Sequence, residues 1–155
     1  MRQIDDGNII DWLPDWENAW LHALRAALPE GQLLLALRDP RDMLMDWLAN
    51  GGHLEYAIES PLAMARWMAP RLAQLADLIE GDLYPHREVR MDGLGEDIPA
   101  LTRAVADALG TELAVVDLHG PSRLPAGHWR VYRDALGDAF ALLAPVAVRL
   151  GYPAD

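Results

Sequence analysis

The chain has 155 residues, of which 52% are hydrophobic, and a formal net charge of −11. This length suits one domain with its own core, and the absence of cysteine excludes disulfides, thiolate metal sites and cysteine nucleophiles. The acidic balance argues against nucleic acids and anionic membrane surfaces as partners.

The first part of the chain predicts a helix, a strand and a second helix. Residues 9–10 are a short strand or an extended lead-in, and the apolar spacing over 16–28 predicts a helix. The continuous apolar run Leu33–Leu37 predicts a strand buried on both faces, as in a parallel sheet. Asp39 can then cap a helix over residues 40–49, whose first position is a proline.

The second part of the chain is read from the same signals: caps, apolar spacing, and glycine or proline breaks. The stretch 113–116 is apolar but ambiguous between strand and helix. The predicted elements are a helix over 60–80, a strand over 87–91, a helix over 97–109, a loop over 119–127 and a last helix over 128–150.

Strands that alternate with helices predict an α/β layer. We expect a helix-rich α/β fold with a small parallel sheet of two or three strands and four or five helices. A two-stranded parallel sheet is small for such a fold. The N-terminal segment, a neighbouring domain or another chain is therefore expected to add a strand.

The turn between the strand and the helix at residues 38–42 is the strongest candidate for a site. The first backbone N–H groups of a helix are unpaired and favour an anion, and Arg38 at the strand end adds a phosphate clamp. All 13 basic residues are arginines, so a Walker-type loop with its lysine is excluded. The alternative is a surface ion-pair cluster of Arg38, Arg41 and Asp42, which would contribute little to the stability of the fold.

The sequence Arg38-Asp39-Pro40-Arg41-Asp42 resembles the 3′-phosphate-binding turn of sulfotransferases that use 3′-phosphoadenosine 5′-phosphosulfate. The resemblance implies that Arg38, with Arg41 beside it, contacts the 3′-phosphate together with a helical residue at position 46. That position is a serine in the family and is Asp46 here.

Two later stretches strengthen the resemblance. Residues 87–94 are similar to the late strand of the family and its acidic turn, and residues 123–132 are similar to the C-terminal pattern of bacterial sulfotransferases that often follow tetratricopeptide repeats. The resemblance implies that Arg123 also approaches the 3′-phosphate. Residues 1–155 then form one sulfotransferase-like domain, a partial P-loop-like layer that is incomplete at its N-terminus.

The chain departs from the family in the residues that perform catalysis. No glycine-rich 5′-phosphosulfate loop precedes Leu33, and His22, the one histidine before Arg38, lies in a predicted helix. No catalytic residue is identified, so we expect no sulfuryl transfer by this chain alone. The ligand that the resemblance implies is 3′-phosphoadenosine 5′-phosphosulfate or adenosine 3′,5′-bisphosphate. The alternative is a non-enzymatic module for self-association or for docking to another protein domain.

Other chemistry-bearing residues favour structural roles. Tryptophans at helical spacing favour a core position over a ligand groove, and the histidines lack metal-ligand spacing. No apolar run approaches the roughly 20 residues of a membrane helix, and the polar N-terminus is unlike a signal peptide, so a cytoplasmic location is expected. The tryptophans concerned are Trp12, Trp16, Trp20 and Trp47.

Overall fold

The computed structural model describes residues 2–3, 9–10, 17–50, 58–93, 97–110, 112 and 124–155. The helix-rich α/β fold with a small parallel sheet is confirmed. The described elements, with 3₁₀ helices marked η, are β1 (Arg2–Gln3), β2 (Ile9–Ile10), η1 (Asn18–Trp20), α1 (Leu21–Ala27), β3 (Leu33–Leu37), α2 (Pro40–Ala49), α3 (Pro61–Glu80), β4 (His86–Arg90), α4 (Ile98–Leu109), η3 (His128–Tyr132) and α5 (Gly137–Arg149).

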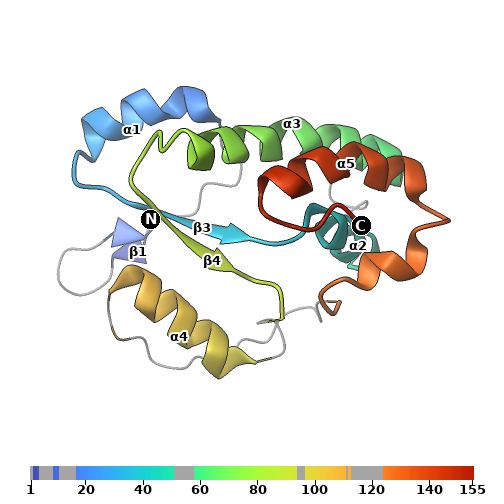
Figure 1. Ribbon diagram of the computed structural model, residues 1–155. Helices are drawn as coiled ribbons and strands as arrows, with labels where there is room; N and C mark the ends of the chain where they lie inside the picture. The colour runs from blue at the N-terminus through green and yellow to red at the C-terminus, as the bar shows by residue number, and fades with distance from the viewer. Residues whose placement is uncertain are drawn as a thin grey trace.

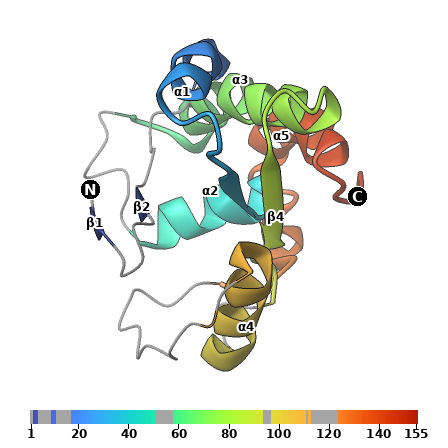
Figure 2. The same cartoon turned by 90° about the vertical axis from the view of Figure 1, so that its left-hand side faces the viewer.

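The parallel sheet consists of β3 and β4, paired from Leu33 opposite His86 to Leu37 opposite Arg90. Helices α1 and α3 lie on one side of these strands and α4 lies on the other (Figures 1 and 2). Strands β1 and β2 pair antiparallel in a sheet of their own. Within the described residues, the N-terminal segment therefore adds no strand to the parallel sheet.

The prediction that β3 is buried on both faces is wrong. Only Leu37 is buried, and the side chain of Leu34 is 38% exposed. A strand is enclosed when strands flank it and helices cover both faces. Here β3 has one described neighbour, so its side chains alternate between partly buried and exposed.

The predicted helix starts follow local capping chemistry. Asp39 accepts a hydrogen bond from the N–H of Arg41 at 2.9 Å, and Ser60 Oγ accepts one from the N–H of Ala63 at 3.1 Å. Prolines follow both caps at the first helical position, where a missing N–H costs nothing. These caps place α2 and α3 as predicted.

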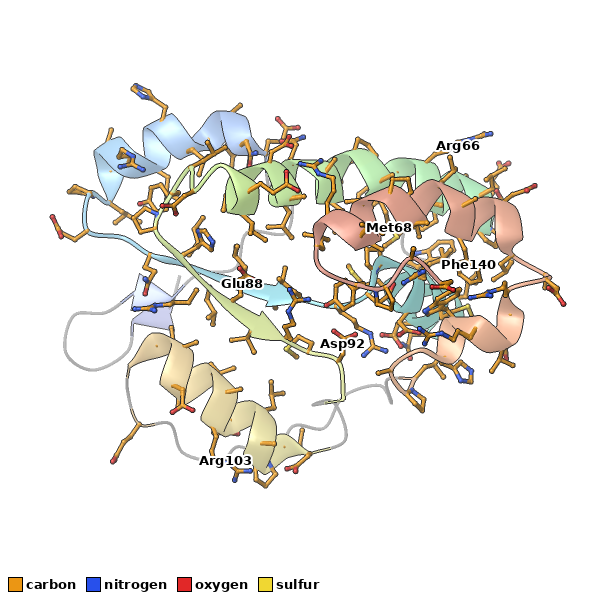
Figure 3. All side chains as sticks on the ribbon, viewed as in Figure 1. Arg66, Met68, Glu88, Asp92, Arg103 and Phe140 are labelled. Carbon is orange, nitrogen blue, oxygen red and sulfur yellow. The ribbon has the colours of Figure 1, made fainter. Side chains whose placement is uncertain are left out.

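The hydrophobic core lies among α2, α3, α5 and η3 instead of under the two strands. Met68 and Phe140, labelled in Figure 3, belong to this cluster between α3 and α5. Leu44 and Leu143 are fully buried in it. Trp129 of η3 meets Phe140 edge-on, with ring centroids 5.5 Å apart. Three helices and η3 therefore provide the apolar packing that the small sheet cannot.

The single last helix predicted over residues 128–150 is wrong. The chain forms η3, turns through residues 133–136 and then enters α5. In one straight helix, residues 129 and 140 would lie about 16 Å apart along the axis. The contact of Trp129 with Phe140 is possible only because the chain reverses between them.

The first predicted helix is described from residue 17 onward, as η1 followed by α1. Its Trp20 is 45% exposed, so the prediction of a core position is wrong for this side chain, whereas Trp47 packs against the core. Trp12, Trp16 and the ambiguous stretch 113–116 lie outside the described residues. No helix in the described parts is both long and apolar enough to cross a membrane.

Candidate functional site

The turn that joins β3 to α2 is buried. Arg38, Asp39, Arg41 and Asp42 are 7%, 5%, 1% and 0% exposed. The cluster is therefore not on the surface, as the alternative expected, although Arg38 and Arg41 do form ion pairs. Charged groups this deeply buried need partners, because desolvation costs several kcal/mol for each ion.

Arg38 and Asp46 form an ion pair that also holds the loop before η3. Arg38 Nε lies 2.9 Å from Asp46 Oδ2, without the alignment of a hydrogen bond. Arg38 Nη2 donates to the carbonyl of Leu124 at 2.6 Å, and the N–H of Leu124 donates to Asp46 Oδ1 at 2.9 Å. Arg123, the neighbouring predicted site residue, lies outside the described residues.

Arg41 is paired separately from Arg38. Its Nε and Nη2 donate to the two carboxylate oxygens of Asp39 at 2.9 and 2.8 Å. Its guanidinium lies 3.9 Å from the centroid of the Trp129 ring. It also donates to the carbonyls of Pro153 and Ala154 at 2.7 and 3.1 Å. Arg41 thus joins the turn to the C-terminal segment.

Asp42 caps the start of η3. Its carboxylate accepts hydrogen bonds from the N–H groups of Gly127 at 2.6 Å and Trp129 at 3.0 Å. Burial raises the pKa of Asp42 above its ordinary value of 3.8, and nearby Asp39 raises it further, whereas the two backbone hydrogen bonds oppose the shift. Keeping the Asp42 carboxylate ionised in the folded protein therefore costs free energy.

Asp92 completes the acidic surroundings of the turn. It follows β4 just as Asp39 follows β3, and parallel strands bring these ends to one edge of the sheet. Asp92 Oδ1 accepts from the N–H of Asp39 at 3.2 Å, and its Oδ2 accepts from the hydroxyl of Tyr152 at 2.7 Å. Burial, followed by the bond to Asp92, raises the pKa of Tyr152.

Sequence reasoning missed the roles of Asp92 and Tyr152. Two signals point to Asp92: it lies in the strand-and-acidic-turn stretch 87–94, and the ends of parallel strands meet. No comparable signal points to Tyr152, because its partners lie 60 or more residues away. Within the described parts of the chain, no three histidines or carboxylates are arranged to hold a metal ion.

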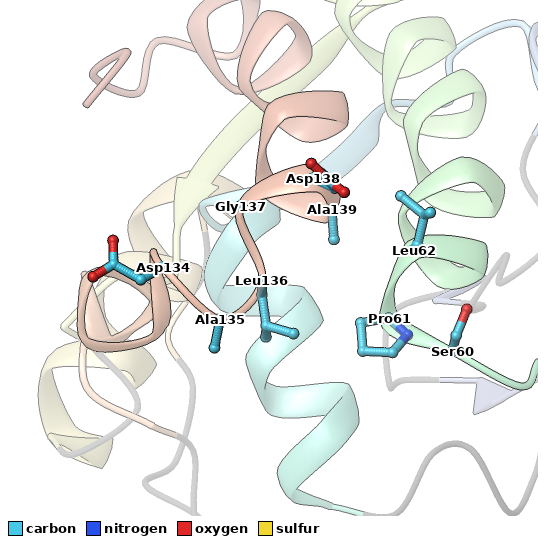
Figure 4. A pocket seen from close by; sticks show the side chains of 9 residues that line it. All are labelled: Ser60, Pro61, Leu62, Asp134, Ala135, Leu136, Gly137, Asp138 and Ala139. Atoms are coloured by element: carbon cyan, nitrogen blue, oxygen red, sulfur yellow. The ribbon is translucent and has the colours of Figure 1, made fainter.

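A hollow of about 320 Å³ lies apart from this turn. It opens between the start of α3 and the reversal before α5, and is lined by residues 60–62 and 134–139 (Figure 4). None of Arg38, Arg41 and Asp46 lines it. The hollow is therefore not part of the predicted site.

No family model, curated protein or solved structure matches this chain. The likeness to sulfotransferases thus stays a prediction drawn from the residues. The structure describes three of the four predicted site residues. Arg38 and Asp46 form an ion pair with each other, and Arg41 forms one with Asp39.

The raised pKa of Asp42 predicts a particular pH dependence of stability. Since the folded protein binds this proton more tightly than the unfolded chain, the contribution of Asp42 to stability rises as the pH falls from above the folded pKa to below 3.8. Asp42→Asn lacks this gain. We expect the stability of wild type relative to Asp42→Asn to rise between neutral pH and about pH 4, measured by urea unfolding. A pH-independent difference would contradict the shift.

Proposed function

We propose that this chain is a sulfotransferase-like domain without catalytic activity of its own, in which the Asp46 carboxylate fills the place of the donor 3′-phosphate. The carrying observation is the ion pair of Arg38 and Asp46, closed by Leu124. The resemblance expects Arg38, position 46 and the loop at residue 123 to surround one phosphate. Arg38, Asp46 and the loop residue Leu124 do meet, and the anion among them is the carboxylate.

The electrostatics of the turn support this proposal. A phosphate that approached Arg38 would meet Asp46 directly, with the carboxylates of Asp39 and Asp42 in the same turn. A phosphate and a carboxylate that share one arginine in a poorly solvated site repel each other strongly. At the start of α2, Pro40 has no N–H and the N–H of Arg41 is bound to Asp39. The residues as they stand do not fit a 3′-phosphate.

A ligand titration tests the proposal directly. We expect adenosine 3′,5′-bisphosphate at millimolar concentration to leave the melting temperature of wild type unchanged. Asp46→Ser frees Arg38 and removes the competing charge, so this variant should be stabilised by the ligand. Ligand at 100 times its dissociation constant adds about 2.7 kcal/mol to the free energy of unfolding.

The matched control is Asp134→Ser, which removes one carboxylate at an exposed position away from the turn. This variant should respond like wild type, which excludes a mere effect of net charge. Tight binding by wild type that is lost in Arg38→Ala would overturn the proposal. Absence of binding by Asp46→Ser would also overturn it, because the turn would then have no phosphate position to fill.

A docking module is the second candidate function, and exposed apolar side chains favour it. Leu28, Leu34 and Leu83 are 48%, 38% and 44% exposed, near the end of the sheet where β3 and β4 begin. Such a group of side chains is a typical contact surface. Sedimentation over a range of protein concentrations distinguishes self-association from a monomer that docks to another protein.

A further inference from the structure

The segment that follows α5 turns back across the start of α2. We call residues 151–155 the C-terminal strap; it ends at the C-terminus marked in Figure 1, and its Pro153 and Ala154 carbonyls are bound by Arg41 of α2. Gly151 makes the turn with φ of +83°, and a Cβ there would lie 3.0 Å from Arg90 Nη2. The backbone angle therefore favours glycine at this position, whereas the end of the exposed Arg90 side chain could shift to admit a Cβ.

Arg41, which holds the strap, is itself held by the rest of the protein. The guanidinium of Arg41 is oriented by two hydrogen bonds to Asp39 and by stacking on Trp129. An arginine has five N–H donors, and Asp39 takes two of them. Others are presented to the strap, where they bind two consecutive carbonyls, those of Pro153 and Ala154. This arrangement recognises an extended backbone and not a particular side chain.

A second contact recognises a side chain. The hydroxyl of Tyr152 donates to Asp92, and the guanidinium of Arg90 lies 5.1 Å from the centre of the Tyr152 ring. An aromatic ring with a hydroxyl satisfies both groups at once. The following residue, Pro153, disfavours the helical conformation for Tyr152 and so favours an extended backbone at the tyrosine. Together the contacts select a tyrosine followed by proline.

The strap lies on the surface although the hydroxyl of Tyr152 and the carbonyls of Pro153 and Ala154 are bound. Pro153, Ala154 and Asp155 are exposed, and no residue of the strap is fully buried. Tyr152 packs against the apolar cluster of Ala76, Val146 and Leu150, whereas residues 153–155 are exposed and form the part of the strap that opens most readily. A receptor that is fixed by its own fold remains after the strap leaves.

We propose that Arg41, Trp129, Arg90 and Asp92 form a receptor for an extended tyrosine-proline peptide, and that its ligand in trans is the strap of a second copy of this chain. In one copy the receptor is filled by its own strap. Exchange of straps between two copies keeps the contacts of the strap with Arg41, Arg90 and Asp92. It requires the short segment after α5 to open, which breaks the bonds from the N–H groups of Gly151 and Tyr152 to the end of α5, and such an exchange of an identical segment is a known route to a dimer.

The probe is a fluorescent peptide with the sequence of residues 150–155, titrated with the full chain and followed by anisotropy. Wild type should bind it weakly, because its own strap competes at high effective concentration. Tyr152→Ala weakens the strap of the chain but leaves the receptor intact. We expect this variant to bind the peptide roughly tenfold more tightly than wild type.

Two controls keep the result specific. Tyr132→Ala removes a partly exposed tyrosine of η3 outside the strap and should bind like wild type. A peptide with alanine in place of tyrosine should bind neither protein. If circular dichroism shows that Tyr152→Ala is unfolded, Pro153→Gly replaces it, because this residue is exposed and its loss loosens the strap. Equal affinity of wild type and the folded strap variant, or absence of binding, overturns the proposal.

Discussion

Replacement of Arg41 by alanine is expected to lower the free energy of unfolding by roughly 3–5 kcal/mol. Arg41 is almost fully buried and balances Asp39, which is 5% exposed. Removal of the guanidinium leaves that carboxylate buried without its cation and the carbonyls of Pro153 and Ala154 without their donors. Urea unfolding followed by circular dichroism measures the loss.

The matched control for this result is Arg66→Ala. Arg66 is an exposed arginine of α3 that points outward in Figure 3. Its loss should change the free energy of unfolding by less than about 0.5 kcal/mol. If Arg41→Ala lowers the free energy of unfolding as little as Arg66→Ala does, the expectation that Asp39 needs its buried cation is wrong.

A pair of neighbouring leucines in α5 gives the second large effect. Leu143 is fully buried against α2 and α3, whereas Leu142 is 41% exposed. Leu143→Ala leaves a cavity among close-packed side chains and should lower the free energy of unfolding by roughly 2–5 kcal/mol. Leu142→Ala removes the same atoms from a site that already meets solvent and should cost less than about 1 kcal/mol.

Because both substitutions remove the same atoms from one helix, differences in helix propensity cancel. Only burial distinguishes the two variants. Equal losses would mean that α5 does not present this face to the core. Thermal unfolding of both variants beside wild type provides an independent measurement.

Local signals predicted much of this fold. An uninterrupted apolar run defined β3, and the caps at Asp39, Ser60 and Asp97 defined the starts of three helices. Each signal acts within a few residues, so the sequence displays it directly. The reversal between η3 and α5 has no such signal, since it follows from the packing of Trp129 on Phe140.

In the candidate site, too, some residues could be predicted from the sequence and others could not. Arg38 and Asp42 were recognisable as charged residues at a strand-to-helix turn. Their partners were not, because Leu124 and Gly127 lie more than 80 residues further along the chain. Position 46 was recognisable as a carboxylate in an unusual place, but only the fold shows that it pairs with Arg38.

These long-range partners have a consequence for the order of folding. The charged side chains at the start of α2 are hydrogen-bonded by backbone groups 85 to 113 residues later. On the ribosome, the helix can form early from local capping, but Arg41 and Asp42 would stay hydrated until the last part of the chain is made. Burial of the turn is then a late event in folding. The charged residues at the start of α2 can be buried only after residues 127–154 have been synthesised and have packed against them.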